Sequence, residues 1–235
     1  MKKVVIKLGG SLVSLSDDNL VNYEYLAKLK SLLEKFIKQD YQFAISIGGG
    51  YLCRKYQKMA SQNIENISNR DLDWIGVATI NLNAEMLRSF LGDMCEEKII
   101  KYDDYKSDLP IEMEKPVIIC AAEEPGHSSD VDAVKIANRV GASVLYRLTD
   151  VDAIYTSDPD KDPNAQALKN LTWQEYYKIL GIEEFTPGGH YPIDPVAARM
   201  AEQSELSFYV MSGNDLENVE NALTGEKFEG SIVTK

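Results

Sequence analysis

Two glycine-rich segments follow short apolar runs near the start of the chain, and each is accompanied by one cation. The first comprises Lys7, Gly9, Gly10 and Ser11, at the end of the apolar run 4–8. Glycines let backbone N–H groups approach phosphate oxygens without a Cβ in the way, and a lysine adds a point charge. The segment predicts a phosphate-binding loop, with a plain strand-to-helix turn and a surface lysine as the alternative. Its spacing differs from G-x-x-x-x-G-K-[ST], which excludes a P-loop kinase.

The second segment is the triple glycine 48–50, which follows the apolar run 41–47 and precedes a predicted helix. Three consecutive glycines cost backbone entropy that a plain turn rarely requires. Arg54, one turn into that helix, has a guanidinium fork that can bind two phosphate oxygens. The pattern predicts a second phosphate-binding loop, and close packing of helix on strand is the alternative for one of the glycines.

A proline-glycine-histidine turn leads into another predicted helix, over residues 130–140. Ser128 and Ser129 offer hydroxyl and N–H groups near the start of that helix, where an anion is favoured. Asp130 precedes the apolar face of the helix, so a purely structural role as its N-cap is the alternative to a role in chemistry. His127 taken alone fits a hydrogen-bonded structural role as well as it fits a ligand.

Strand and helix patterns alternate along the chain. Short apolar runs predict strands over residues 4–8, 41–47, 116–120, 143–148, 206–211 and 231–233. Apolar residues at helical spacing predict helices over 23–39, 52–62, 72–91, 130–140, 173–180 and 216–223, with another that opens at Asp194 and Pro195. This alternation predicts an α/β fold, a three-layer αβα sandwich with a mainly parallel central sheet, in a single domain over residues 1–235. Ligands of such sheets gather at the carboxyl ends of the strands, where both glycine segments lie.

The bulk composition narrows the classes of function. The formal net charge is −12, and no basic run of the length expected for a nucleic-acid footprint is present, so nucleic acid is not an expected partner. No apolar run approaches the roughly 20 residues that span a bilayer. The start of the chain is charged too early for a signal peptide, and we expect a cytoplasmic protein. Three separated cysteines and two histidines argue against a zinc site.

Taken in order along the chain, these segments resemble the amino acid kinase superfamily and, within it, the uridylate kinases of the archaeal type. The matching segments are the helix at 71–84, the loop 125–130, the segment 149–163 (TDVDAIYTSDPDKDP), the helix start at 193–198 and the closing strand at 230–233. The long segment 149–163 is the most specific, because it is similar to the family's T-x-V-D-G-V-Y-T-x-D-P-x-K-D-P. The resemblance implies an amino acid kinase-like fold and the ATP-dependent phosphorylation of UMP to UDP, with Mg²⁺ accompanying ATP.

The resemblance also implies roles for individual residues. Lys7 and Asp130 would be catalytic, with Asp130 orienting Lys7 or the Mg²⁺ rather than contacting phosphate, because like charges repel. The residues implied to bind ATP are Gly9, Gly10, Ser11, Gly50, Arg54, Thr149, Tyr155 and Asp158. The residues implied to bind UMP are Gly49, Asp73, Glu123, Glu124, Pro125, Gly126, His127, Ser128 and Ser129. No side chain is assigned as a metal ligand, and the implied assembly is a homohexamer, a trimer of dimers.

Four positions depart from the family pattern. Glu123 and Glu124 stand where threonine and histidine are usual, Ala153 replaces a glycine, and Arg147 lies in the predicted strand before the nucleotide segment. Carboxylates beside an anionic acceptor would repel it unless a cation intervenes. Two other functions therefore stay open: a nucleotide- or oxoanion-binding storage or regulatory protein, similar to the molybdenum storage proteins, and a kinase for another small acid. The retained lysine and arginine of the glycine segments favour the enzyme.

Overall fold

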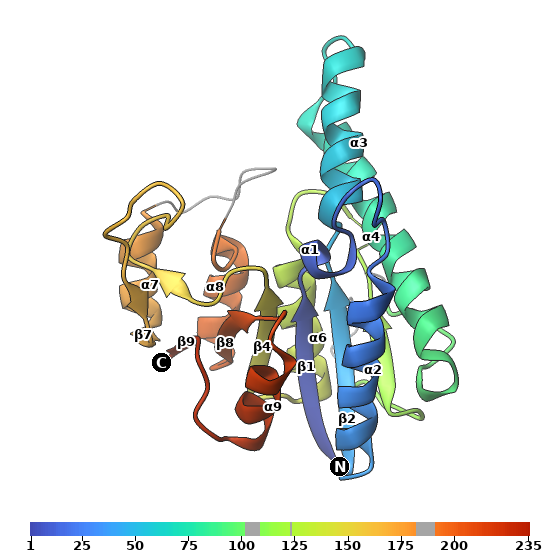
Figure 1. Cartoon of the computed structure of the whole chain (residues 1–235), viewed down its shortest axis with the longest axis vertical. Helices are drawn as coiled ribbons and strands as arrows, with labels where there is room; N and C mark the ends of the chain where they lie inside the picture. Colours follow the sequence, from blue (N-terminus) through green and yellow to red (C-terminus); the bar gives the residue numbers. More distant parts are fainter. Residues whose placement is uncertain (102–108, 123, 182–190) are drawn as a thin grey trace.

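The computed structural model describes residues 1–101, 109–122, 124–181 and 191–235, and its centre is a twisted sheet (Figure 1). Over the described residues this sheet has seven strands in the order β3-β2-β1-β4-β8-β9-β7. The strands are β1 (Lys2–Leu8), β2 (Tyr41–Ile47), β3 (Val117–Cys120), β4 (Val144–Thr149), β7 (Asn170–Thr172), β8 (Ser207–Ser212) and β9 (Ser231–Thr234). All neighbouring strands pair in parallel except β8 and β9, which are antiparallel. The predicted, mainly parallel sheet is confirmed.

Helices cover both faces of this sheet. They are α1 (Gly10–Val13), α2 (Tyr23–Ile37), α3 (Gly50–Asn63), α4 (Asn69–Leu91), α6 (Ser129–Val140), α7 (Trp173–Leu180), α8 (Pro195–Gln203) and α9 (Leu216–Thr224), with a 3-10 turn η1 (Gly92–Met94). One buried apolar cluster joins the sheet to α1, α2, α4 and α9, and a second joins it to α6, α7 and α8. Figure 1 shows α2 and α9 in front of the sheet and α6 behind it. The predicted three-layer sandwich is therefore also confirmed.

The alternation of side chains along β1 places one polar residue on a buried face. Ile6 and Leu8 belong to the first apolar cluster, and Val5 belongs to the second. Because successive side chains of a strand point to opposite faces, Lys7 shares the face of Val5, which α6 covers. The strand order reverses at this place, since β2 lies on one side of β1 and β4 on the other. Such a switch point leaves a crevice at the carboxyl ends of the strands.

The short helix α1 and the edge strand β7 were not predicted from the sequence, and two further features of the fold also differ from the expectation. Helix α4 begins at Asn69 rather than at residue 72, because the Ser68 hydroxyl caps it and accepts from the Asp71 N–H at 3.1 Å. A small antiparallel hairpin of β5 (Ile154–Tyr155) and β6 (Ala167–Leu168) was not expected. Strands of two residues are too short to show an alternating pattern.

None of the helices in the described ranges is both long enough and apolar enough to cross a membrane.

Candidate active site

The two glycine segments contact each other at the carboxyl ends of β1 and β2. A Cβ added to Gly10 would lie 2.1 Å from the Gly50 nitrogen and 2.7 Å from the Gly48 carbonyl carbon. Gly50 has a φ of +67°, in the left-handed region that favours glycine. The Gly9 N–H donates to the Leu148 carbonyl at 2.8 Å, which ties the first loop to β4. Close backbone packing therefore requires glycine at several of these positions, whereas the sequence analysis considered such packing for only one glycine of the segment 48–50.

Ser14 connects the first glycine segment to the start of α3. The Tyr51 N–H donates to the Ser14 carbonyl at 3.0 Å, and the Leu52 N–H donates to the Ser14 hydroxyl at 3.3 Å. Gly49, the N-cap residue of α3, has no side chain to serve these amides. A serine from another loop thus caps this helix, which local sequence could not predict.

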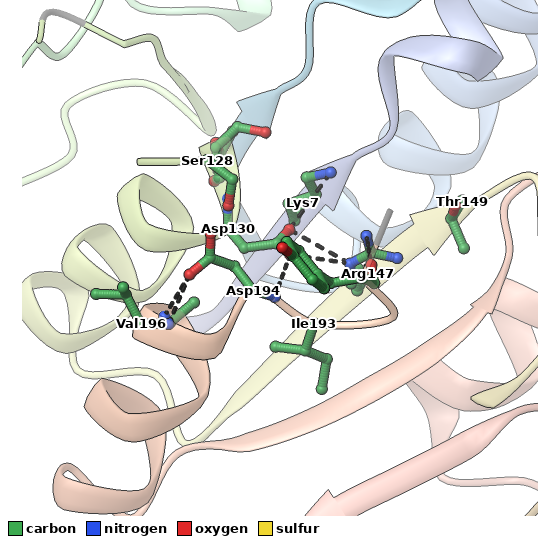
Figure 2. A network of polar contacts seen from close by, with 12 residues as sticks. Lys7, Ser128, Asp130, Arg147, Thr149, Ile193, Asp194 and Val196 are labelled. Carbon is green, nitrogen blue, oxygen red and sulfur yellow. Dashed lines mark hydrogen bonds and ion pairs between the residues drawn. The ribbon is translucent and has the colours of Figure 1, made fainter. Parts of the chain in front are cut away.

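Lys7 lies in a buried ion network with Asp130 and Arg147 (Figure 2). Lys7 Nζ is 3.4 Å from Asp130 Oδ1, and Arg147 Nε is 3.3 Å from both carboxylate oxygens. The three side chains are 11%, 4% and 11% exposed for Lys7, Asp130 and Arg147 respectively. The Asp194 N–H also donates to Asp130 Oδ2, at 3.1 Å. The carboxylate is held by several donors, which suits a positioning group better than a proton acceptor.

Burial and charge act in opposite directions on this network. Burial is the largest effect on Lys7 and lowers its pKa; Asp130 opposes this, while the like charge of Arg147 lowers it further. Burial by itself would raise the pKa of Asp130, but the positive charges of Arg147 and Lys7 outweigh it and hold that pKa below its usual value. Asp130 is therefore ionised at neutral pH, and a lysine with a lowered pKa keeps its charge only over a narrower pH range.

Helix α6 begins with Ser128, not Asp130, as its N-cap. The Ser128 hydroxyl accepts from the Asp130 N–H at 3.2 Å, and Asp130 lies inside the first turn. The alternative that Asp130 is the N-cap is therefore wrong, and its carboxylate instead contacts the cations Lys7 and Arg147. Ser46, in register with Lys7 on the neighbouring strand, donates from its hydroxyl to the Ser129 carbonyl at 3.2 Å. This bond fixes the helix start against the sheet.

A buried tyrosine fixes the segment that carries Asp194. The Tyr176 hydroxyl donates to the Ile193 carbonyl and accepts from the Ile193 N–H at 2.8 Å. The Asp194 carboxylate accepts from the Val196 and Ala197 N–H groups at 2.7 and 3.0 Å, so the predicted cap of α8 is confirmed. The Asp194 backbone reaches Asp130 from this fixed position.

A cavity of about 280 Å³ opens between α3, α4 and the loop that precedes α6. The predicted site residues that line it are Gly49, Gly50, Arg54, Asp73, Pro125, His127, Ser128 and Ser129. Gly126 contributes through its backbone, whose N–H donates to Asp73 Oδ2 at 3.1 Å. Glu124 is exposed, and Glu123 lies outside the described residues.

Asp73 and His127, which both line the cavity, interact with neighbouring polar groups. Burial raises the pKa of Asp73, although the Gly126 N–H and the nearby His127 oppose the shift. His127 Nε2 lies 3.1 Å from Asp132 Oδ1, and Asp132 is 1% exposed on α6. His127 therefore lines the cavity and also has a structural partner, and its role toward a ligand stays a prediction.

Cys53 and Gln57 line the same cavity and were not predicted as site residues. Gln57 lies three residues after Arg54 on α3, so helical spacing from the arginine was the signal that pointed to it. Its side-chain amide donates to the Leu72 carbonyl at 2.9 Å, which joins α3 to α4 across the cavity. Burial raises the pKa of the Cys53 thiol.

Three of the predicted ATP-binding residues converge on Asp150, which the sequence did not single out. The Thr149 hydroxyl donates to Asp150 Oδ1 at 3.0 Å. Burial would raise the pKa of Asp150, but hydrogen bonds from Thr149 and Ser11 and the charge of Arg54 together hold it below the usual value. Residues from α1, α3 and β4 thus meet around one carboxylate.

The rest of the nucleotide segment has local partners. The Tyr155 hydroxyl donates to Asp152 Oδ1 at 2.8 Å. Asp158 pairs with Lys161 at 2.7 Å, in a turn whose residues are largely exposed. The structure places these two predicted residues away from the buried ion network, and their roles toward ATP stay predictions.

The fold and site define the class of the protein. The model of the amino acid kinase family matches residues 2–212, and the chain belongs to this family. A crystal structure of uridylate kinase from Archaeoglobus fulgidus superposes with a TM-score of 0.78 over 100% of both chains, at 29% sequence identity.

Within the family, the chain is similar to curated uridylate kinases over nearly its whole length. The uridylate kinase of Methanocella arvoryzae is 33% identical over 98% of this chain and 99% of its own length. The uridylate kinase of Pyrococcus abyssi is 29% identical, with the same coverage. The UMP kinase of Bacillus anthracis, at 19% identity and a TM-score of 0.78, shares the fold.

Proposed function

We propose that this chain transfers the γ-phosphate of ATP to UMP, forming ADP and UDP. The observation that carries the proposal is the similarity to uridylate kinases, which runs over 98% of the chain. A storage protein on the same fold is not favoured by this similarity.

The buried network fits the demands of phosphoryl transfer. The reaction requires alignment of donor and acceptor and neutralisation of the charge on the transferring group. Lys7 supplies that charge at the switch point of the sheet, between the glycine segments and the start of α6. The acceptor phosphate of UMP is already ionised, so no general base is needed. Asp130, which is paired with two cations, orients Lys7.

The cavity is the proposed UMP site. Asp73 would accept hydrogen bonds from the ribose hydroxyls, and Arg54 would face phosphate oxygens from one turn inside α3. The loop 124–129 lies over the same cavity, with its backbone fixed to α4 through Gly126. The residues of the proposed ATP side are Gly9, Gly10, Ser11, Gly50, Arg54, Thr149, Tyr155 and Asp158, of which Gly50 and Arg54 also line the cavity. The Ser11, Thr149 and Arg54 convergence on Asp150 supports this assignment.

Mg²⁺ would enter with ATP. Among the described residues, no group of three or more His, Cys, Asp or Glu side chains is placed to hold a metal ion. Mg²⁺ often keeps several waters and is held chiefly by substrate phosphates. When bound, it would neutralise phosphate charge alongside Lys7.

A homo-oligomer is the proposed assembly, and the family resemblance implies a trimer of dimers. Exposed apolar side chains on the protruding pair α3 and α4 support it: Tyr56, Met59 and Trp74 are 54%, 49% and 44% exposed. Multi-angle light scattering at micromolar concentration should return a multiple of the 26.3 kDa chain mass. A monomer mass would contradict the proposal.

A coupled assay of ADP release tests the function. Purified protein with ATP and Mg²⁺ should respond to UMP more strongly than to CMP, AMP, acetylglutamate or isopentenyl phosphate. ATP binding without acceptor-dependent ADP release would overturn the kinase proposal. A stronger response to another acceptor would retain the kinase and reassign its substrate.

A further inference from the structure

Arg147 is a buried cation to which the family resemblance assigns no role. It lies on β4 directly beside Lys7 in the register of the sheet, at the switch point. Its side chain is 11% exposed, the same as that of Lys7. Two cations on adjacent strands of one buried face repel each other, and such an arrangement is unfavourable unless anions compensate it.

Asp130 is the carboxylate in ion-pair contact with both cations. Arg147 approaches it side-on, with Nε at 3.3 Å from each oxygen, and the Asp194 N–H occupies Oδ2 as well. Lys7 Nζ lies 3.4 Å from Oδ1, and this distance, like the two Arg147 distances, is longer than the roughly 2.7–2.9 Å of a strong charge-assisted hydrogen bond, but Arg147 is hydrogen-bonded to both oxygens. Figure 2 shows Lys7 and Arg147 meeting Asp130 from different sides. The arginine therefore has the larger share of the carboxylate.

Arg147 is itself held in place from outside the network. A terminal guanidinium nitrogen, Nη2, donates to the Tyr191 carbonyl at 3.3 Å. The neighbouring Asp194 carboxylate is turned toward the start of α8, where it accepts from two amides, and so it does not compete for the guanidinium. Because the planar guanidinium of Arg147 has fixed partners on two sides, it is pre-organised, whereas the ammonium of a lysine is flexible.

We propose that Arg147 is a positioning residue for phosphoryl transfer: by engaging Asp130, it prevents that carboxylate from closing on Lys7 and leaves the Lys7 ammonium directed to the transferring phosphate. This inference rests on the proposed function. Without Arg147, Lys7 and Asp130 would form a tighter pair, and the lysine charge would be withdrawn from the phosphate.

A double-mutant cycle tests this dependence on Lys7. Arg147→Met should lower kcat about 10²-fold, the effect of misplacing a catalytic group by about 1 Å, with little change in the KM for UMP. In a Lys7→Met background the same change should cost less than about threefold, because its target is gone. Arg147→Lys keeps a charge that competes for Asp130 and should restore most of the activity. Thermal unfolding of each variant identifies any loss caused by misfolding.

The outcomes separate this inference from the proposed function. Equal losses from Arg147→Met in both backgrounds, or no loss in either, overturn the inference while UMP phosphorylation by the unmodified protein stands. If the unmodified protein binds ATP but does not phosphorylate UMP, the function fails, and calorimetry with Mg²⁺ and the non-hydrolysable analogue AMP-PNP decides the inference. Arg147→Met should then remove the preference for AMP-PNP over ADP when Lys7 is present and leave it unchanged in the Lys7→Met background. Any other pattern overturns the inference.

Discussion

The buried ion network and the nucleotide segment 149–163 represent two ways in which this chain carries functional residues. Lys7, Asp130 and Arg147 come from β1, α6 and β4, and each is at most 11% exposed at its side chain. Tyr155 and Asp158 lie in a short hairpin and a turn, with hydrogen-bonding partners two or three residues away. Apart from Asp150, which interacts with Ser11 and Arg54, the segment with the most specific sequence motif is thus the one with the more local contacts.

The difference teaches that motif length and tertiary constraint are separate properties. A loop that binds a ligand through its own backbone and turns needs its residues in a fixed local order, which a sequence displays directly. A charge network between distant elements needs only one residue from each, and burial magnifies the effect of every change in it. We expect substitutions to be costly in the network and mild in the turn, and the following predictions test this contrast.

The largest effect should come from Lys7→Met. The substitution removes a charge that is most valuable in the transition state, and kcat should fall about 10²–10³-fold with a small change in the KM for UMP. Steady-state kinetics with both substrates varied provide the measurement. An effect confined to KM would show that Lys7 binds ground-state phosphate only.

Gly10→Ala should destabilise the fold by about 3 kcal/mol or more, because the added Cβ has no room against a neighbouring backbone. That Cβ would lie 2.1 Å from the Gly50 nitrogen. Gly141→Ala is the matched control: its φ of +73° lies in the left-handed helical region, but no atom lies within 4 Å of the added Cβ. It should cost only about 1–2 kcal/mol of backbone strain. Urea denaturation measures both, and equal losses would contradict the contact between the glycine segments.

Tyr176→Phe should cost about 1–3 kcal/mol of stability, because it leaves the buried Ile193 N–H without its acceptor. It should also lower kcat, since the next residue, Asp194, holds Asp130 through its N–H. Tyr177→Phe is the control, because that hydroxyl donates to Glu202 on α8 and not to the network. If both variants keep full kcat, the Asp194 contact does not position Asp130.

With rising pH, kcat should fall at an alkaline pH that lies below the ordinary lysine pKa of 10.5. Burial, with the like charge of Arg147, favours neutral Lys7, and the active charged form disappears as the pH rises through this lowered pKa. Arg147→Met removes one of these causes and should move this fall in kcat to higher pH. Rates at saturating substrate between neutral and alkaline pH provide the test, and a fall at an unchanged pH would assign it to another group.

The smallest effect should come from Asp158→Asn in the nucleotide segment. Its ion pair with Lys161 lies in an exposed turn, and the thermal unfolding temperature should not change measurably. Because Asp158 is proposed to bind ATP from this turn, the KM for ATP should rise by about threefold to tenfold, the value of about one hydrogen bond, with kcat unchanged. An unchanged KM would remove Asp158 from the ATP side, and a fall in kcat as large as that of Lys7→Met would remove the contrast between the regions.

Much of the fold and part of the site were predictable from the sequence. Alternating apolar runs and helical faces predicted the order of strands and helices, because burial of one face or stripe is a local periodic property. Asp194 followed by Pro195 predicted the start of α8 for a similarly local reason. At Asp130, by contrast, the sequence allowed a cap that Ser128 provides instead, since a hydroxyl and a carboxylate two residues apart are both good caps.

The sequence by itself determined the layered α/β fold, the two glycine segments and the membership of the kinase family, because these depend on residue types at short, fixed spacings. Only the tertiary structure decided which of these residues act together. Parallel register brings Lys7 beside Arg147, although 140 positions separate them, and α6 delivers Asp130 to both. The contact of Gly10 with Gly50 and the capping of α3 by Ser14 likewise appear only once β1 and β2 lie side by side. Strand order and crossover connections set these neighbours, and neither is encoded in a local pattern.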